Sequence, residues 1–121
     1  MDAELRDFLR HSLRSVWNIE ILLALFRTPT RAWTAADLVR ELRASDFIVT
    51  QGTQGLQEAG LVVAEADVAF RYAPASTDLD RKVQELERIY RERPSVVTKT
   101  LFAPPEDKLQ TFADAFRLKK D

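Results

Sequence analysis

The 121-residue sequence has no cysteine and a single histidine, His11. The absence of cysteine excludes disulfide bonds, thiolate zinc sites and cysteine nucleophiles. No second ligand lies near His11 at the spacing of a metal site, so we expect neither a metal nor another cofactor. The chain also lacks a glycine-rich phosphate loop and a Ser-His-Asp pattern, and its carboxylates lie on polar helix faces. We therefore predict that it is not an enzyme.

Long hydrophobic runs are missing as well. The longest apolar stretch, over residues 19–26, is too short to span a bilayer, and the N-terminus is acidic and polar rather than a signal peptide. We therefore expect a cytoplasmic protein with no membrane partner. With 45% hydrophobic and 31% charged residues, the composition is typical of a helix-rich globular protein, and the length predicts one domain over residues 1–121.

Positive charge is missing from the middle of the chain. Residues 44–70 contain four acidic residues and no lysine or arginine, whereas residues 1–43 carry seven basic and six acidic residues, and residues 71–121 carry eleven and nine. The formal net charge of the whole chain is −1. Phosphate neutralisation supplies most of the non-specific affinity of a DNA-binding protein, so the middle segment has the wrong charge for such a role.

Two helices are expected in the first quarter of the chain. Apolar residues at helical spacing predict an amphipathic helix over residues 4–13. Ser15 is a cap signal for a second helix over residues 16–26, which the pair Thr28-Pro29 ends. The second helix has too many apolar residues to be exposed and should lie in the core.

The next two predicted helices are short and close together. Thr34 is a cap signal for a helix over residues 35–43, and Ser45 is a second cap signal for a helix that ends at Gly60. Two short helices joined by a tight connection form a helix-turn-helix.

β-favouring runs follow this motif and flank an acidic turn, which predicts a hairpin, or wing, over residues 61–73. The helical pattern then returns over residues 78–93, until Pro94 interrupts it. A shorter apolar piece runs to Phe102, and a last helix is predicted over residues 106–118.

The order of these elements resembles the winged helix-turn-helix regulators of the MarR, PadR and ArsR kind. The pattern that carries the resemblance consists of Ser45, Val49, Leu56, Gly60 and Leu61. It implies a fold class that is mainly α with a small β-hairpin (α+β), with an extra N-terminal helix. The winged core would span residues 15–74 and a C-terminal helical extension residues 77–118. The family function would be that of a bacterial transcription regulator that binds double-stranded DNA as a homodimer.

The resemblance also assigns roles to single residues. The outward face of the second helix of the motif would contact DNA, with Thr50, Gln51 and Gln54 as the side chains that read bases. Glutamine amides can pair with adenine, and a threonine can meet a thymine methyl or a phosphate. Because this helix has no basic residue, phosphate contacts would come from arginines on other elements, with Arg40, Arg43 and Arg71 as the best candidates. The row Arg6, Arg10 and Arg14 on the N-terminal helix is either a second source of such contacts or a solvated helix face.

The missing positive charge keeps a second class of function open. A winged-helix module that binds another protein, and not DNA, would use the acidic helix-and-wing face, with Phe47 and Asp67 directed toward the partner. Phe47 is equally compatible with a position under the first helix. Gly52 and Gly55 each cost about 1 kcal/mol in a helix interior. We favour tight packing of Gly52 on the preceding helix over close approach by a partner.

The C-terminal helices are the candidates for self-association. Their apolar stripes exceed what one small motif hides, so we expect a homodimer, although the same stripes could instead cover the sheet and first helix of a monomer. Trp17 and Trp33 are expected as a core residue and a helix staple, respectively, and not as parts of a ligand cage. The residues predicted for dimerisation are Leu79, Val83, Leu86, Tyr90, Phe112 and Phe116.

Overall fold

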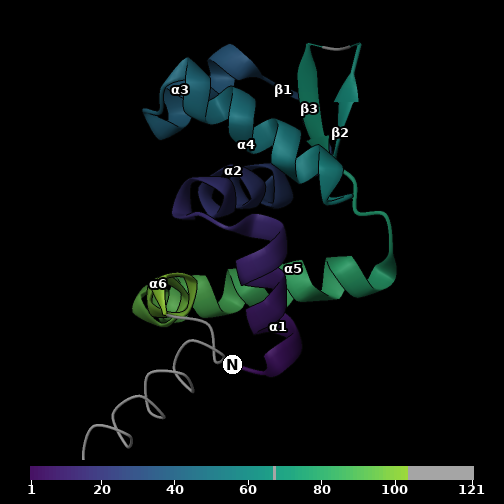
Figure 1. Cartoon of the computed structure of the whole chain (residues 1–121). Helices are drawn as coiled ribbons and strands as arrows, with labels where there is room; N and C mark the ends of the chain where they lie inside the picture. Colours follow the sequence, from purple (N-terminus) through teal and green to yellow (C-terminus); the bar gives the residue numbers. More distant parts are fainter. Residues whose placement is uncertain (67, 104–121) are drawn as a thin grey trace, which may run out of the picture.

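The computed structural model describes residues 1–66 and 68–103. In chain order its elements are α1 (Ala3–Asp7), η1 (Phe8–Leu13), α2 (Val16–Arg27), β1 (Trp33–Thr34), α3 (Ala35–Leu42), α4 (Asp46–Glu58), β2 (Val62–Glu65), β3 (Ala69–Tyr72), α5 (Thr77–Glu92) and α6 (Pro94–Phe102). Figure 1 shows three tiers: α3, α4 and the hairpin lie above α2, and α1, α5 and α6 lie below it. The arrangement confirms the predicted winged-helix fold, mainly α with a small antiparallel sheet.

The predicted N-terminal helix consists of two different helical segments. The α-helical turns of α1 continue as the π-helix η1, in which the Arg14 N–H donates to the carbonyl of Leu9, five residues earlier (2.8 Å). Leu9 and Leu13 are fully buried. Arg14 then leaves the helix in the left-handed conformation, with a φ of 73°. The sequence periodicity predicted the helix but not its change of type.

The central helix α2 begins where the sequence predicted. Ser15 Oγ accepts a hydrogen bond from the Asn18 N–H (3.1 Å), which satisfies one of the free donors of the first turn. Its five buried residues are Ile19, Ile21, Leu22, Leu23 and Leu25. Trp17 is 38% exposed, so its predicted core position is wrong. A side chain in the first turn of a helix has neighbours on fewer sides than one in its middle.

The sheet has one more strand than the sequence predicted. β2 and β3 form the expected antiparallel hairpin, with Val62 opposite Tyr72 and Glu65 opposite Ala69. The two-residue strand β1 adds to the other side of β3 and gives the order β1-β3-β2. Trp33 on β1 is 5% exposed and belongs to the core. The sheet thereby connects the start of α3 to the wing.

The lower helix α5 is fixed to the winged core by polar contacts at both ends. Tyr72 Oη donates to Asp80 Oδ1 (2.6 Å), and Tyr90 Oη donates to Glu20 Oε1 (2.5 Å). Burial, together with the Asp80 carboxylate, raises the pKa of Tyr72 above its ordinary range. Burial and Glu20 raise the pKa of Tyr90 to about 12. Both hydroxyls therefore remain protonated donors at neutral pH.

Pro94 ends α5 as predicted, and the apolar piece that follows it forms α6, with Pro94 in its first turn. The helix predicted over residues 106–118 lies outside the described residues. In the part of the chain that the structure describes, no helix combines the length and apolar character needed to cross a membrane.

Candidate nucleic-acid interface

The outward face of α4 carries the residues that the sequence predicted for base contacts. These three, Thr50, Gln51 and Gln54, follow Phe47 by three, four and seven residues. This spacing places all four side chains on one helix face. All four are exposed, and Phe47 is 72% exposed. The alternative position of Phe47 under the first helix is therefore wrong. The four residues form a polar row with one aromatic ring, which we call the α4 row.

The opposite face of α4 explains how this helix is held. A Cβ added at Gly52 would lie 2.5 Å from Ile21 Cδ1 and 2.9 Å from Asn18 Oδ1, so only glycine permits this approach to α2. Tight packing of Gly52 is thus confirmed, but its partner is α2 and not the preceding helix α3. A Cβ at Gly55 would lie 3.8 Å from Asn18 Nδ2, an ordinary contact. Close packing at Gly52 fixes which face of α4 points outward.

The three arginines predicted to contact phosphate differ in their surroundings. Arg40 Nη2 lies 2.7 Å from Asp37 Oδ1, and Arg71 Nη1 lies 2.9 Å from Glu65 Oε1. Arg43 is exposed at the C-cap of α3, where its φ is 55°, and makes no ion pair with the described part of the chain. Two of the three positive charges are therefore paired with carboxylates of the chain itself.

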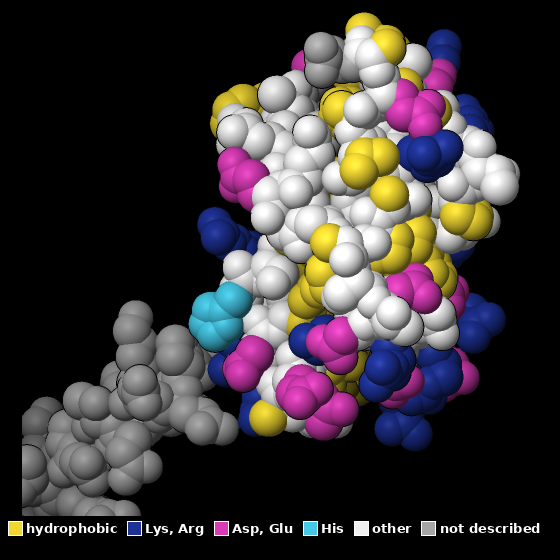
Figure 2. Space-filling model, turned by 90° about the vertical axis from the view of Figure 1, so that its right-hand side faces the viewer, with side chains coloured by type: hydrophobic (Ala, Val, Ile, Leu, Met, Phe, Trp, Pro, Cys, Tyr) yellow, Lys and Arg dark blue, Asp and Glu magenta, His cyan; other side chains and the backbone are white. Residues whose placement is uncertain are grey.

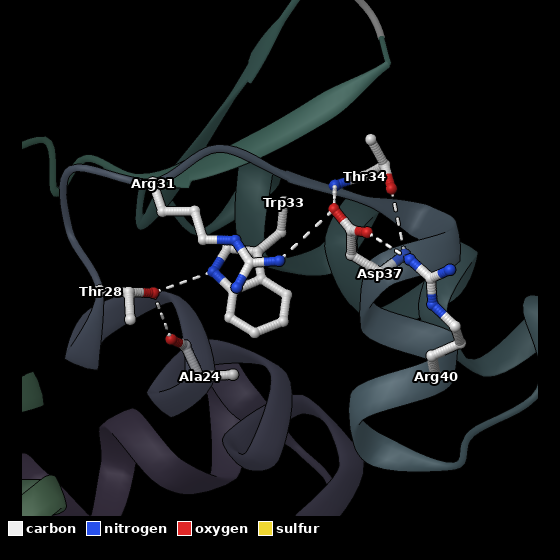
Figure 3. A network of polar contacts seen from close by, with 7 residues as sticks. All are labelled: Ala24, Thr28, Arg31, Trp33, Thr34, Asp37 and Arg40. Atoms are coloured by element: carbon white, nitrogen blue, oxygen red, sulfur yellow. Dashed lines mark hydrogen bonds and ion pairs between the residues drawn. The ribbon is translucent and has the colours of Figure 1, made fainter.

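Asp37 is the centre of a polar network at the start of α3 (Figure 3). Asp37 Oδ2 accepts from the Thr34 N–H (3.1 Å), and Thr34 Oγ1 accepts from the Asp37 N–H (3.0 Å), which completes the predicted capping box. The Arg31 guanidinium carbon lies 3.7 Å from the centroid of the Trp33 ring. Hydrogen bonds from Thr34 lower the pKa of Asp37 most, and a hydrogen bond from Arg40 and the charge of Arg31 lower it further. The ionised carboxylate thus holds two arginines beside α3.

A groove that the sequence did not predict runs beside the α4 row. It has a volume of about 620 Å³ and lies between α4 and the junction of η1 with α2. Its lining includes His11, Arg14, Asn18, Gln51, Gln54 and Glu58. No sequence spacing connects positions 11–18 with positions 51–58, because only the tertiary packing of α2 on α4 brings them together.

Charges of both signs are mixed on the surface of the lower tier. In Figure 2, Lys and Arg side chains are interspersed with Asp and Glu over the tier of α1 and α5, and the described residues of this face form no continuous basic strip. Val68 in the turn between β2 and β3 is 65% exposed. Asp67, the other predicted partner-facing residue, lies outside the described residues. Within those residues no group of three His, Asp or Glu side chains is placed to hold a metal ion.

The residues predicted for dimerisation lie in different environments. Val83 and Leu86 are 0% exposed and belong to the core of the single chain, so they offer no surface to a second copy. Leu79 and Tyr90 are partly buried and pack against the same core. These four residues therefore fit the alternative prediction, in which the apolar stripe of α5 covers the core of a single chain. The last two predicted positions, Phe112 and Phe116, lie outside the described residues.

Comparison with known proteins adds a fold and no more. No protein-family model matches the sequence, and no curated protein matches it. The structure is similar to the crystal structure of adhesin competence repressor (AdcR) from Streptococcus pyogenes, with a TM-score of 0.53 and 17% sequence identity. The similarity covers 92% of this chain and 82% of that chain. At this identity the likeness supports the winged-helix fold and leaves activity to be argued from the site.

Proposed function

We propose that this protein is a transcription regulator that binds double-stranded DNA through α4. The α4 row is the observation that supports the proposal most. Three of its members, Thr50, Gln51 and Gln54, are exposed polar side chains on one face of a helix that Gly52 holds firmly against α2. Such a row can enter the major groove and form hydrogen bonds with base edges. Likeness to a protein that is named as a repressor supports the same proposal.

Phe47 fits this role as well. It lies in the first turn of α4, one turn before Gln51, and an aromatic ring can make apolar contact with a thymine methyl. A preferred site is therefore expected to combine adenine, opposite a glutamine amide, with thymine. Such selectivity comes from base edges and does not depend on the number of phosphate contacts.

The paired arginines set the strength of binding. Exposed ion pairs such as those of Arg40 and Arg71 contribute about 0–1 kcal/mol, so a phosphate can compete for either guanidinium. The freed carboxylate would then repel the phosphate backbone. We therefore expect weak non-specific affinity and a shallow dependence on salt, below that of proteins that make roughly 6 to 10 phosphate contacts.

A homodimer is part of the proposal, because two copies related by a two-fold axis can bind both halves of a palindromic site. Since Val83 and Leu86 are fully buried, the interface would use side chains that remain at the surface of the lower tier. Phe102 at the end of α6 is 73% exposed and is the strongest apolar candidate among the described residues.

A second function, binding of a protein partner by the same face, is favoured by one observation. Phe47 is a large exposed aromatic side chain, and the acidic residues Asp46 and Glu58 are exposed on the same helix. Aromatic side chains are frequent energetic centres of protein interfaces. In this alternative a basic partner would cover α4, and no duplex would be retained at low salt.

Two exposed glutamines on different helices provide a matched test of the proposal. Gln51 lies in the α4 row, whereas Gln84 lies on α5, where its Nε2 donates to Asp80 Oδ2 (2.7 Å). After selection of a preferred duplex from a random pool, Gln51→Ala should cost roughly 1–3 kcal/mol of specific binding. Gln84→Ala should leave binding unchanged. Equal affinities for all three proteins, or failure to enrich any duplex, would contradict base readout by α4.

A further inference from the structure

The groove beside the α4 row joins two kinds of side chain. Its α4 wall contributes Gln51 and Gln54, the proposed base-reading residues, and its other wall contributes His11 and Arg14. Ser15, whose Oγ also caps α2, lines the groove as well. Arginine and serine side chains are frequent phosphate partners in protein–DNA complexes. The groove therefore places phosphate-binding chemistry directly beside the base-reading face.

The backbone fixes the direction of Arg14. This residue ends η1 in the left-handed conformation, with a φ of 73°, and its Nε donates to the carbonyl of His11 (3.0 Å). The hydrogen bond uses one of the five donors of the guanidinium and leaves its two terminal nitrogens without an ion-pair partner among the described residues. Arg40 and Arg71, by contrast, are paired with Asp37 and Glu65.

We infer that one DNA strand runs along this groove, with Arg14 as its principal phosphate contact and His11 beside it. The inference rests on the proposed function and names the residues that supply its phosphate contacts. A helix in the major groove, which is about 12 Å wide, lies between two phosphate backbones. The groove between α4 and the η1–α2 junction lies where one of these backbones would pass. A phosphate contact in this groove would explain how α4, which has no basic residue of its own, can bind DNA.

Glu58 is the one acidic side chain in the lining of this groove. It lies on α4, and Gln54 Nε2 donates to its Oε1 (3.4 Å). A phosphate held by Arg14 would approach this carboxylate and be repelled by it. Loss of the charge in Glu58→Gln should therefore strengthen DNA binding, whereas loss of the positive charge across the groove should weaken it.

The test uses substitutions of Arg14 in the whole protein, with Arg81→Ala as the control. Arg81 is exposed on α5, away from this groove, and its loss changes the net charge equally. Binding of a fluorescent random-sequence duplex is measured over a series of salt concentrations. Arg14→Ala should make the slope of log affinity against log salt shallower by about 0.9, the value for one lost phosphate contact. Arg14→Lys, which keeps the charge, and Arg81→Ala should retain the wild-type slope.

Arg14→Gly separates loss of contact from loss of folding. Glycine adopts a positive φ without strain, so this variant should be at least as stable in thermal unfolding and still lose the same salt slope. If the wild type binds and all Arg14 variants keep its slope, the inference is overturned while DNA binding survives. If the wild type retains no duplex at low salt, the proposed function and the inference fall together. Tighter binding by Glu58→Gln supports the groove, and unchanged binding counts against it.

Discussion

Arg71 Nη1 on β3 lies 2.9 Å from Glu65 Oε1 on β2, so the one basic side chain of the hairpin is held by its neighbour across the strands. The register explains the pairing. Arg71 is opposite Val63 and Glu65 is opposite Ala69, which makes the two charged residues diagonal neighbours on adjacent strands. The wing therefore presents little net positive charge to a phosphate backbone.

Removal of the Glu65 charge should release this arginine. We expect Glu65→Gln to increase affinity for a random duplex at low ionic strength and to steepen the salt slope by up to about 0.9, because Arg71 becomes available for one phosphate contact. Glu41→Gln is the matched control, since Glu41 is exposed and pairs with no arginine among the described residues. Equal changes in slope for both variants would show that net charge alone acts, and would contradict a role for Arg71.

The two glycines inside α4 should respond in opposite directions to alanine. Gly52→Ala places a Cβ within 2.5 Å of Ile21 Cδ1, and Ile21 is fully buried, so the strain should lower the free energy of unfolding by roughly 1–3 kcal/mol. Gly55→Ala meets only an ordinary contact and should raise stability by up to about 1 kcal/mol through helix propensity. Chemical denaturation measures both. A neutral Gly52→Ala would contradict the close packing of α4 on α2.

The hydrogen bond from Tyr90 to Glu20 predicts a loss of stability in alkali. Burial and Glu20 raise the pKa of Tyr90 to about 12 in the folded protein, above the value near 10 of an unfolded chain. The contribution is therefore complete below pH 10 and disappears as the pH rises from 10 to about 12. Tyr90→Phe should cost about 1 kcal/mol at neutral pH. Between pH 10 and 12, the free energy of unfolding of this variant should fall less than that of the wild type. If the free energies of both proteins fall in parallel with pH, the proposed contribution of the Tyr90 hydroxyl is contradicted.

Leu86 and Phe102 should differ in what they stabilise. Leu86 is fully buried, so Leu86→Ala should lower the free energy of unfolding by about 2–5 kcal/mol. Phe102 is 73% exposed, so Phe102→Ser should change stability by less than about 0.5 kcal/mol. If α6 contributes to a dimer, Phe102→Ser should weaken self-association, which sedimentation equilibrium measures. A wild type that stays monomeric at high concentration would contradict the proposed homodimer.

Local signals in the sequence were sufficient for most of the helices. The caps at Ser15, Thr34 and Ser45 are hydrogen bonds within a few residues, and each begins a helix as predicted. The two-residue strand β1 was missed because Trp33 and Thr34 pair with β3, more than thirty residues away, and a pair of residues has no period. The π-helix η1 was missed because apolar spacing does not distinguish neighbouring helix types.

The candidate site was less predictable than the fold. Exposure of Thr50, Gln51 and Gln54 follows from the helical period, which also places Val49 and Leu56 inward. The carboxylate partners of Arg40 and Arg71 depend on rotamers and strand register, which composition does not contain. The groove lined by Arg14 depends on how α2 crosses α4, a relationship set by Gly52 and Ile21.

Titration of the wild-type protein against a random-sequence duplex at low ionic strength tests DNA binding most directly, before any preferred sequence is known. Fluorescence anisotropy reports the affinity, and stepwise addition of salt reports how many phosphates are contacted. We predict measurable binding that weakens with salt along a shallow slope, corresponding to fewer than about 6 contacts. The absence of binding at the lowest salt concentration would contradict the account and would leave the exposed face of α4, including Phe47, to a protein partner.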